Sequence, residues 1–128
     1  MRKGLSTAYS GLAWLIVAAV VVQFFLAGLG IFGASDFDAH RAFGNVVQGL
    51  TLIVVLLAIA GPRTGRDIGM AVVLLVVTTV QIGLVALRDD APGLTALHPV
   101  FALVVMGLAS HIGSRYLGRG ERGSAAVT

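Results

Sequence analysis

Residues 23–50 read QFFLAGLGIFGASDFDAHRAFGNVVQGL, and a related pattern returns 58 residues later, where residues 81–108 read QIGLVALRDDAPGLTALHPVFALVVMGL. A recurrence without insertion over about thirty positions indicates an internal duplication of one supersecondary unit. Polar residues are scarce in this chain, so coinciding polar residues are more informative than coinciding Val or Leu. Each unit predicts a helix, a short loop and a second helix that opens with a histidine. The coinciding polar residues are Gln23 and Gln81, and His40 and His98.

The composition excludes an ordinary water-soluble domain. Of the 128 residues, 57% are hydrophobic and 12% are charged, and the mean hydropathy is +0.95. The charges are segregated, and the charge-free stretches between them can each hold the roughly 20 apolar residues of a membrane-spanning helix. Only helices or closed barrels satisfy their backbone in lipid, and these runs are too continuous for barrel strands. The predicted spans are residues 12–32, 43–60, 68–87 and 94–112.

The predicted fold is an all-α, integral membrane four-helix bundle, with residues 1–128 forming one domain. It consists of two tandem helical hairpins, about residues 10–60 and 68–117, related by a pseudo-twofold axis along the membrane normal. The tail over residues 120–128 turns to Gly, Ser and charge, and we expect it to be disordered.

The basic residues predict the orientation of the chain. They fall before the first span, between the second and third, and after the fourth, so all three groups share one face. The opposite face carries four aspartates and only two arginines. Because basic loops stay in the cytoplasm, we expect both termini to be cytoplasmic. Arg strongly outnumbers Lys, and Ala and Gly are abundant, which hints at a GC-rich bacterial genome and hence at a bacterial inner-membrane protein. The three basic groups are Arg2 and Lys3, Arg63 and Arg66, and Arg115, Arg119 and Arg122.

Several functional classes are excluded by missing residues. The chain has no cysteine, which rules out disulfides, thiolate metal sites, covalent haem attachment and cysteine catalysis. It has no nucleophile–base pair, Walker loop or HExxH motif, so an enzyme is not the favoured interpretation. The net charge of +3 belongs to membrane topology and does not indicate nucleic-acid binding. No acidic residue lies within a predicted span, so a proton relay is not expected.

The two matched histidines are the main chemical signal. A twofold axis along the membrane normal would take His40 onto His98, so their side chains would face each other across the bundle at one depth. Two neutral imidazoles in this arrangement can clamp a planar metal macrocycle, and haem b is the expected occupant. Two histidines alone make a poor zinc site, which takes three or four protein ligands.

Four further residues are candidates for contact with such a cofactor. Gly44 and Ala102 each follow a histidine by one turn and leave room for a porphyrin. Arg41 and Arg88 lie at the outer surface, where they can pair with the propionate carboxylates.

Other interpretations of the polar residues remain open. A single histidine near a helix start is more often an interfacial, solvated residue than a ligand. The side chains of Gln23 and Gln81 can form hydrogen bonds between helices, each of which stabilises the bundle by about 1 kcal/mol. Alternatively, they can contact a cofactor or quinone. His111 has no counterpart in the other repeat, and we interpret it as an interfacial histidine at the cytoplasmic side.

Taken together, the glutamine in the first helix, the His40-Arg41 pair opening the second and His98 opening the fourth resemble one half of heme A synthase. In that family each half is a four-helix bundle whose two histidines bind haem, which implies ligation by His40 and His98. The family's acidic residue three positions before the first histidine is replaced by Phe37, and its loop cysteines are missing, so catalysis is not implied. The chain also resembles an uncharacterised family of small four-span bacterial membrane proteins.

Three functions follow from these observations. The first is a b-type haem protein that transfers electrons, as a respiratory or quinone-linked accessory protein. The second is a cofactor-free interaction or assembly subunit of a larger membrane complex. The third, weaker option is a small transporter or a lipid-binding protein. Membrane lipid is the expected environment, and the sequence does not predict the oligomeric state.

Overall fold

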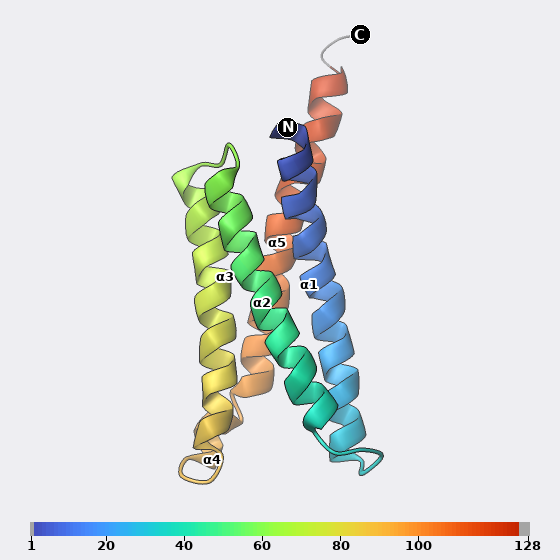
Figure 1. Cartoon of the computed structure of the whole chain (residues 1–128), viewed down its shortest axis with the longest axis vertical. Helices are drawn as coiled ribbons and strands as arrows, with labels where there is room; N and C mark the ends of the chain where they lie inside the picture. Colours follow the sequence, from blue (N-terminus) through green and yellow to red (C-terminus); the bar gives the residue numbers. More distant parts are fainter. Residues whose placement is uncertain (1, 126–128) are drawn as a thin grey trace.

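The computed structural model describes residues 2–125, and the side chains of residues 4–115. Within this range the fold is all-helical. The long helices are α1 (Arg2–Ile31), α2 (Asp38–Ala60), α3 (Gly65–Leu84) and α5 (His98–Ala125); the 3-10 turn η1 (Val85–Leu87) and the one-turn helix α4 (Pro92–Thr95) connect α3 to α5 (Figure 1).

Four segments are long and apolar enough to cross a membrane, which confirms the predicted number of spans and suits a multi-pass membrane protein. They are Gly4–Ile31, Asp38–Ala60, Gly65–Leu87 and Pro92–Arg115.

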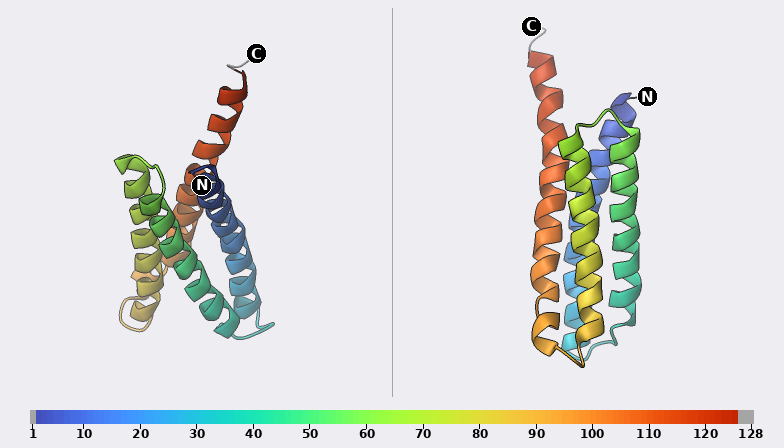
Figure 2. Two further views of the ribbon diagram at one scale, coloured as in Figure 1. Left: turned by 45° about the horizontal axis from the view of Figure 1, so that its top comes forward. Right: turned by 90° about the vertical axis from the view of Figure 1, so that its left-hand side faces the viewer.

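The four long helices form a closed ring. α1 packs against α2 and α5, and α3 packs against the same two helices, so α2 and α5 occupy opposite corners. The start of α1, the α2–α3 loop and the end of α5 lie at one end of the bundle, which we call the terminal end (Figures 1 and 2). The α1–α2 loop and α4 lie at the other, which we call the histidine end because His40 and His98 are near it.

The turn after α1 explains how the first hairpin forms. Gly33 has a φ of 72°, a left-handed conformation that favours glycine. It lets the Ala34 N–H donate to the Leu29 carbonyl at 2.8 Å and the Gly33 N–H donate to the Gly30 carbonyl at 3.2 Å, the Schellman pattern that ends a helix.

The next helix begins almost at once. Phe37 occupies the N-cap of α2 without a side-chain capping bond. Asp36 Oδ1 instead accepts from the N–H of Asp38, the first residue of α2, at 3.0 Å.

The fully buried core lies toward the terminal end. On each long helix, the buried residue nearest to the histidine end marks the limit of this core. These residues are Val20 on α1, Val47 on α2, Thr78 on α3 and Ala102 on α5. Residues 21–46 and 79–101, all of which the structure describes, include no fully buried residue. The bundle is therefore closely packed at the terminal end and more open at the histidine end.

The structure departs from the expected boundaries at three places. α1 begins at Arg2, well before the predicted start at residue 12. α5 is helical as far as Ala125, past residue 120 where disorder was expected, and residues 126–128 lie outside the described residues. Asp67, predicted in a loop, is in the first turn of α3 and is only 3% exposed, so the expectation that no acidic residue enters a span was wrong.

Candidate functional site

The structure brings His40 and His98 together across the bundle. His40 is in the first turn of α2 and His98 is the first residue of α5. Their ring centroids are 6.0 Å apart and their ring planes are inclined by 70°. Pro99 follows in the first turn of α5, where its missing N–H is tolerated, so the helix can begin at the histidine.

A main-chain carbonyl of the preceding helix holds each imidazole. His40 Nδ1 is 3.2 Å from the Gln23 carbonyl oxygen, and His98 Nδ1 is 2.9 Å from the Gln81 carbonyl oxygen. A carbonyl only accepts, so in the neutral ring Nδ1 carries the hydrogen and Nε2 keeps its lone pair. Metal-binding histidines are commonly oriented by such a bond from the other ring nitrogen.

The glutamine side chains lie in the same polar layer. Gln23 Oε1 and Gln81 Oε1 are buried and, among the described residues, have no hydrogen-bond partner. A Cβ added at Gly44 would lie 2.9 Å from Gln23 Nε2, so the Gln23 amide rests against this glycine. The space that the sequence assigned to a porphyrin beside Gly44 is thus taken by Gln23. Ala102, its counterpart on α5, is 7% exposed.

Phe37 is a neighbour of the histidine pair that the sequence did not predict. Its ring makes an edge contact with His40, at 6.2 Å between centroids. It also lies so close to Gly30 that an added Cβ would be 2.8 Å from the ring. Gly30 therefore permits a close approach that fixes Phe37 beside His40. The repeat offered no signal for it, because the matched position is Thr95.

The two candidate arginines are at the rim of the layer and are exposed. Arg41 Nη1 is 2.8 Å from Asp38 Oδ1, and Arg88 Nε is 3.5 Å from Asp89 Oδ2. Exposed pairs of this kind contribute little to stability, so either arginine can exchange its aspartate for another carboxylate.

The geometry of the histidine pair is compatible with one metal centre between the rings. Metal–imidazole bonds are about 2 Å long, so two imidazoles on opposite sides of one ion have ring centres about 6 Å apart. No group of three or more His, Asp or Glu side chains suited to a bare ion occurs among the described residues. A macrocycle that brings four equatorial ligands of its own suits two histidines better, provided that Gln23 moves off Gly44.

The other polar residues lie apart from this layer. His111 is exposed on α5, toward the terminal end. Gln48 Nε2 donates to Thr79 Oγ1 at 2.8 Å and so links α2 to α3. An interhelical bond of this kind needs no ligand to explain it.

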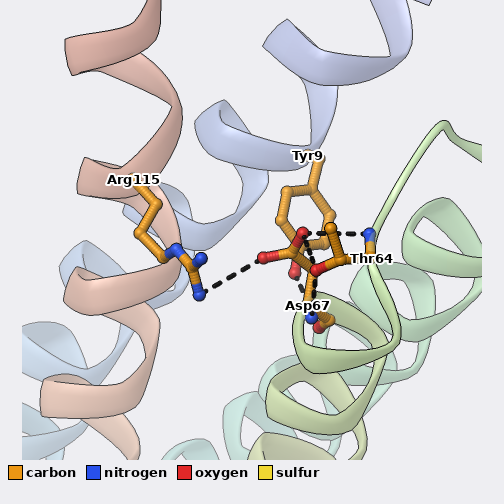
Figure 3. A network of polar contacts seen from close by, with 4 residues as sticks. All are labelled: Tyr9, Thr64, Asp67 and Arg115. Carbon is orange, nitrogen blue, oxygen red and sulfur yellow. Dashed lines mark hydrogen bonds and ion pairs between the residues drawn. The ribbon is translucent and has the colours of Figure 1, made fainter.

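A second polar group joins the helices at the terminal end (Figure 3). Asp67 Oδ2 accepts from the Thr64 backbone N–H at 3.1 Å and from the Thr64 hydroxyl at 2.7 Å, within a capping box that opens α3. Asp67 Oδ1 is 3.4 Å from Arg115 Nη1 on α5, and the Tyr9 hydroxyl on α1 donates to the Asp67 carbonyl at 3.4 Å. These contacts bring α1, α3 and α5 together around one buried carboxylate.

Comparison with known proteins identifies one family. Residues 23–87 match the model of a family of unknown function, DUF6220. The match begins at Gln23 and includes His40, and it ends at the last residue of η1. No curated protein and no solved structure matches the chain. Since the matched segment covers just over half of the sequence, the chain belongs to the family of unknown function DUF6220.

Proposed function

We propose that this protein binds haem b between His40 and His98 and transfers electrons, as a respiratory or quinone-linked accessory protein. The observation that carries the proposal is the pair of imidazoles on opposite corners of the bundle, 6.0 Å apart, each with Nδ1 held by a carbonyl. That bond leaves both Nε2 atoms available as axial ligands.

The remaining residues have supporting roles in this proposal. Haem supplies the one-electron redox chemistry when bound. Gly44 and Ala102 present small surfaces to the macrocycle, and Gln23 withdraws its amide from Gly44 to admit it. Arg41 and Arg88 release Asp38 and Asp89 to pair with the propionates.

The proposal includes a pseudo-twofold relation between the hairpins, as expected from the duplication. Each histidine bonds to a carbonyl 17 residues earlier, and several contacts join residues that are 58 apart: His40 with His98, Tyr9 with Asp67, and Leu5 with Arg63. The proposal also includes the likeness to one half of heme A synthase, which rests on Gln23, the His40-Arg41 pair and His98. It further includes a bacterial inner membrane as the location. The basic groups favour an orientation with the terminal end in the cytoplasm and the histidine end outside.

An absorption spectrum of detergent-purified protein, expressed with adequate haem and recorded oxidised and reduced, tests the proposal first. Sharp bands of six-coordinate low-spin haem are expected in the wild type. His40→Ala and His98→Ala should each remove them, because either change deletes an axial ligand. His111→Ala is the matched control and should keep the spectrum. A colourless protein that also fails to take up added haem would refute haem binding.

A cofactor-free assembly subunit is the second candidate. It is favoured by the direct contact between the two imidazoles and by the Gln23 amide already placed against Gly44, since both fill the layer without a ligand. Exposed apolar side chains would then face lipid or a partner subunit. A colourless protein that co-purifies in fixed ratio with a larger membrane enzyme would support this candidate.

A further inference from the structure

The polar bonds near the histidine end stay within one hairpin. His40 bonds to Gln23, so its partner lies on the other helix of the α1–α2 hairpin. His98 bonds to Gln81 within the α3–α5 hairpin. The Thr95 hydroxyl likewise donates to the Leu84 carbonyl at 2.9 Å. Each histidine is therefore fixed to its own hairpin and not to the opposite one.

Most polar contacts between the hairpins gather at the terminal end, and the hydrogen bond from Gln48 to Thr79 adds one near the middle of α2. The Ser10 hydroxyl on α1 donates to the Gly113 carbonyl on α5 at 2.7 Å. Trp14 lies against the same glycine, where an added Cβ would be 2.6 Å from the indole Nε1. The Tyr9 hydroxyl adds its bond to Asp67 (Figure 3). This end is also where the fully buried residues lie, so it holds the hairpins together.

Little connects the hairpins at the histidine end. Between residues 21–46 of one hairpin and 80–101 of the other, all described by the structure, there is no hydrogen bond or ion pair. The His40 and His98 rings meet across this layer, with 6.0 Å between their centroids. Separating the hairpins here breaks no hydrogen bond of either histidine and removes no fully buried side chain from a packed core.

We propose that the two hairpins separate at the histidine end while the terminal end stays closed, and that this opening admits the ligand of the histidine pair. Regions with few buried contacts open at the lowest free-energy cost, and here such a region surrounds the site. Opening also frees the Gln23 amide to leave Gly44. Closure then brings both Nε2 atoms onto the ligand. The ligand's identity as haem rests on the proposed function, whereas the opening itself does not.

Distances between spin labels can test the opening, because the chain has no native cysteine to interfere. The pair Ala42→Cys and Val100→Cys places one exposed label on a helix of each hairpin at the histidine end. The pair Ala8→Cys and Ser114→Cys does the same at the terminal end and is the matched control. Double electron–electron resonance would be recorded in nanodiscs without ligand and after addition of haemin.

Without ligand, we expect the distance distribution at the histidine end to be at least about twofold broader than at the terminal end. Haemin should narrow the first distribution and leave the second unchanged. If the distance distributions at the two ends of the ligand-free protein were equally narrow, the histidine end would not open. If they were equally broad, the terminal end would not stay closed. Either result would overturn the proposal.

The two proposals fail separately. A broad distribution at the histidine end in a protein that takes up no haemin refutes haem binding and upholds the opening. A narrow one in a protein that binds haemin refutes the opening and leaves haem binding in place.

Discussion

Gly44 decides whether a flat cofactor can lie against α2. Its missing side chain leaves a place that the Gln23 amide fills, and an amide at the end of a flexible side chain can move away. A branched side chain on the helix itself cannot. In the proposed haem site the histidines would supply the ligands, and this glycine would supply the space.

Gly44→Leu should therefore lower haem content at least about tenfold, since the new side chain fills the macrocycle's place and resists displacement. Gly49→Leu is the matched control, because Gly49 is exposed on the same helix and has no neighbour within 4 Å of an added Cβ. Haem per protein would be measured from the absorbance of the purified variants, with helix content by circular dichroism. Wild-type haem content in Gly44→Leu would place the cofactor elsewhere.

Gly113 is a packing glycine between α5 and α1. Gly113→Ala would bring a Cβ within 2.6 Å of Trp14 Nε1, so the indole has to shift. We expect the free energy of unfolding to fall by about 1–3 kcal/mol. Gly107→Ala, at an exposed site of α5 with open space, should instead raise it by about 0.5–1 kcal/mol. Denaturant titrations in detergent would measure the free energy of unfolding of both variants. A similar change in this free energy at both positions would contradict close packing of Gly113 on Trp14.

The sequence predicted that the two histidine side chains lie close together, but it did not predict the hydrogen-bond partners that orient them. The matched positions in the sequence predicted that His40 and His98 lie across from each other, and their ring centroids are 6.0 Å apart. The sequence could not identify the Gln23 and Gln81 carbonyls as their partners, because every residue has a carbonyl and only the packing of two helices selects one. The Gln23 amide against Gly44 was missed for the same reason.

Charge segregation predicted all four spans but misjudged the start of α3. Asp67 stands beside Arg66 in a polar segment, so its charge assigned it to a loop. The Thr64 side chain and the capping box draw it into the first helical turn, and Arg115 from α5 pairs with it. A charged residue can enter a span when a residue far away in the sequence supplies the opposite charge. A local hydropathy pattern does not reveal that second residue.

Asp67→Ala should destabilise the protein by about 3 kcal/mol, because it removes one partner of a largely buried ion pair and half of the capping box. Thermal or denaturant unfolding would measure the loss. Asp90→Ala changes an exposed carboxylate and should alter stability by less than about 0.5 kcal/mol. An Asp67→Ala variant as stable as Asp90→Ala would show that the terminal end is held by apolar packing alone.

The whole bundle is asymmetric along its length. Its terminal end has the buried core, the Asp67 group and the termini, whereas its histidine end has two short connections and a polar layer. The proposed opening depends on this division, since uniform packing would close both ends. The composition and the four spans predicted the bundle, but the division depends on which layers pack closely, which only the three-dimensional arrangement reveals.

The orientation of this asymmetry in the membrane decides which compartment has access to the site. The distribution of basic residues predicts that the terminal end is cytoplasmic, which would turn the histidine end outward. In intact cells a membrane-impermeant maleimide should label Ser35→Cys and Asp90→Cys, both exposed at the histidine end. Pro62→Cys, exposed in the α2–α3 loop, should react only after the cells are opened. The native chain lacks cysteine, so each signal reports one position. The reverse pattern would turn the histidine pair toward the cytoplasm, and electron donors and haem would then have to reach it from inside the cell.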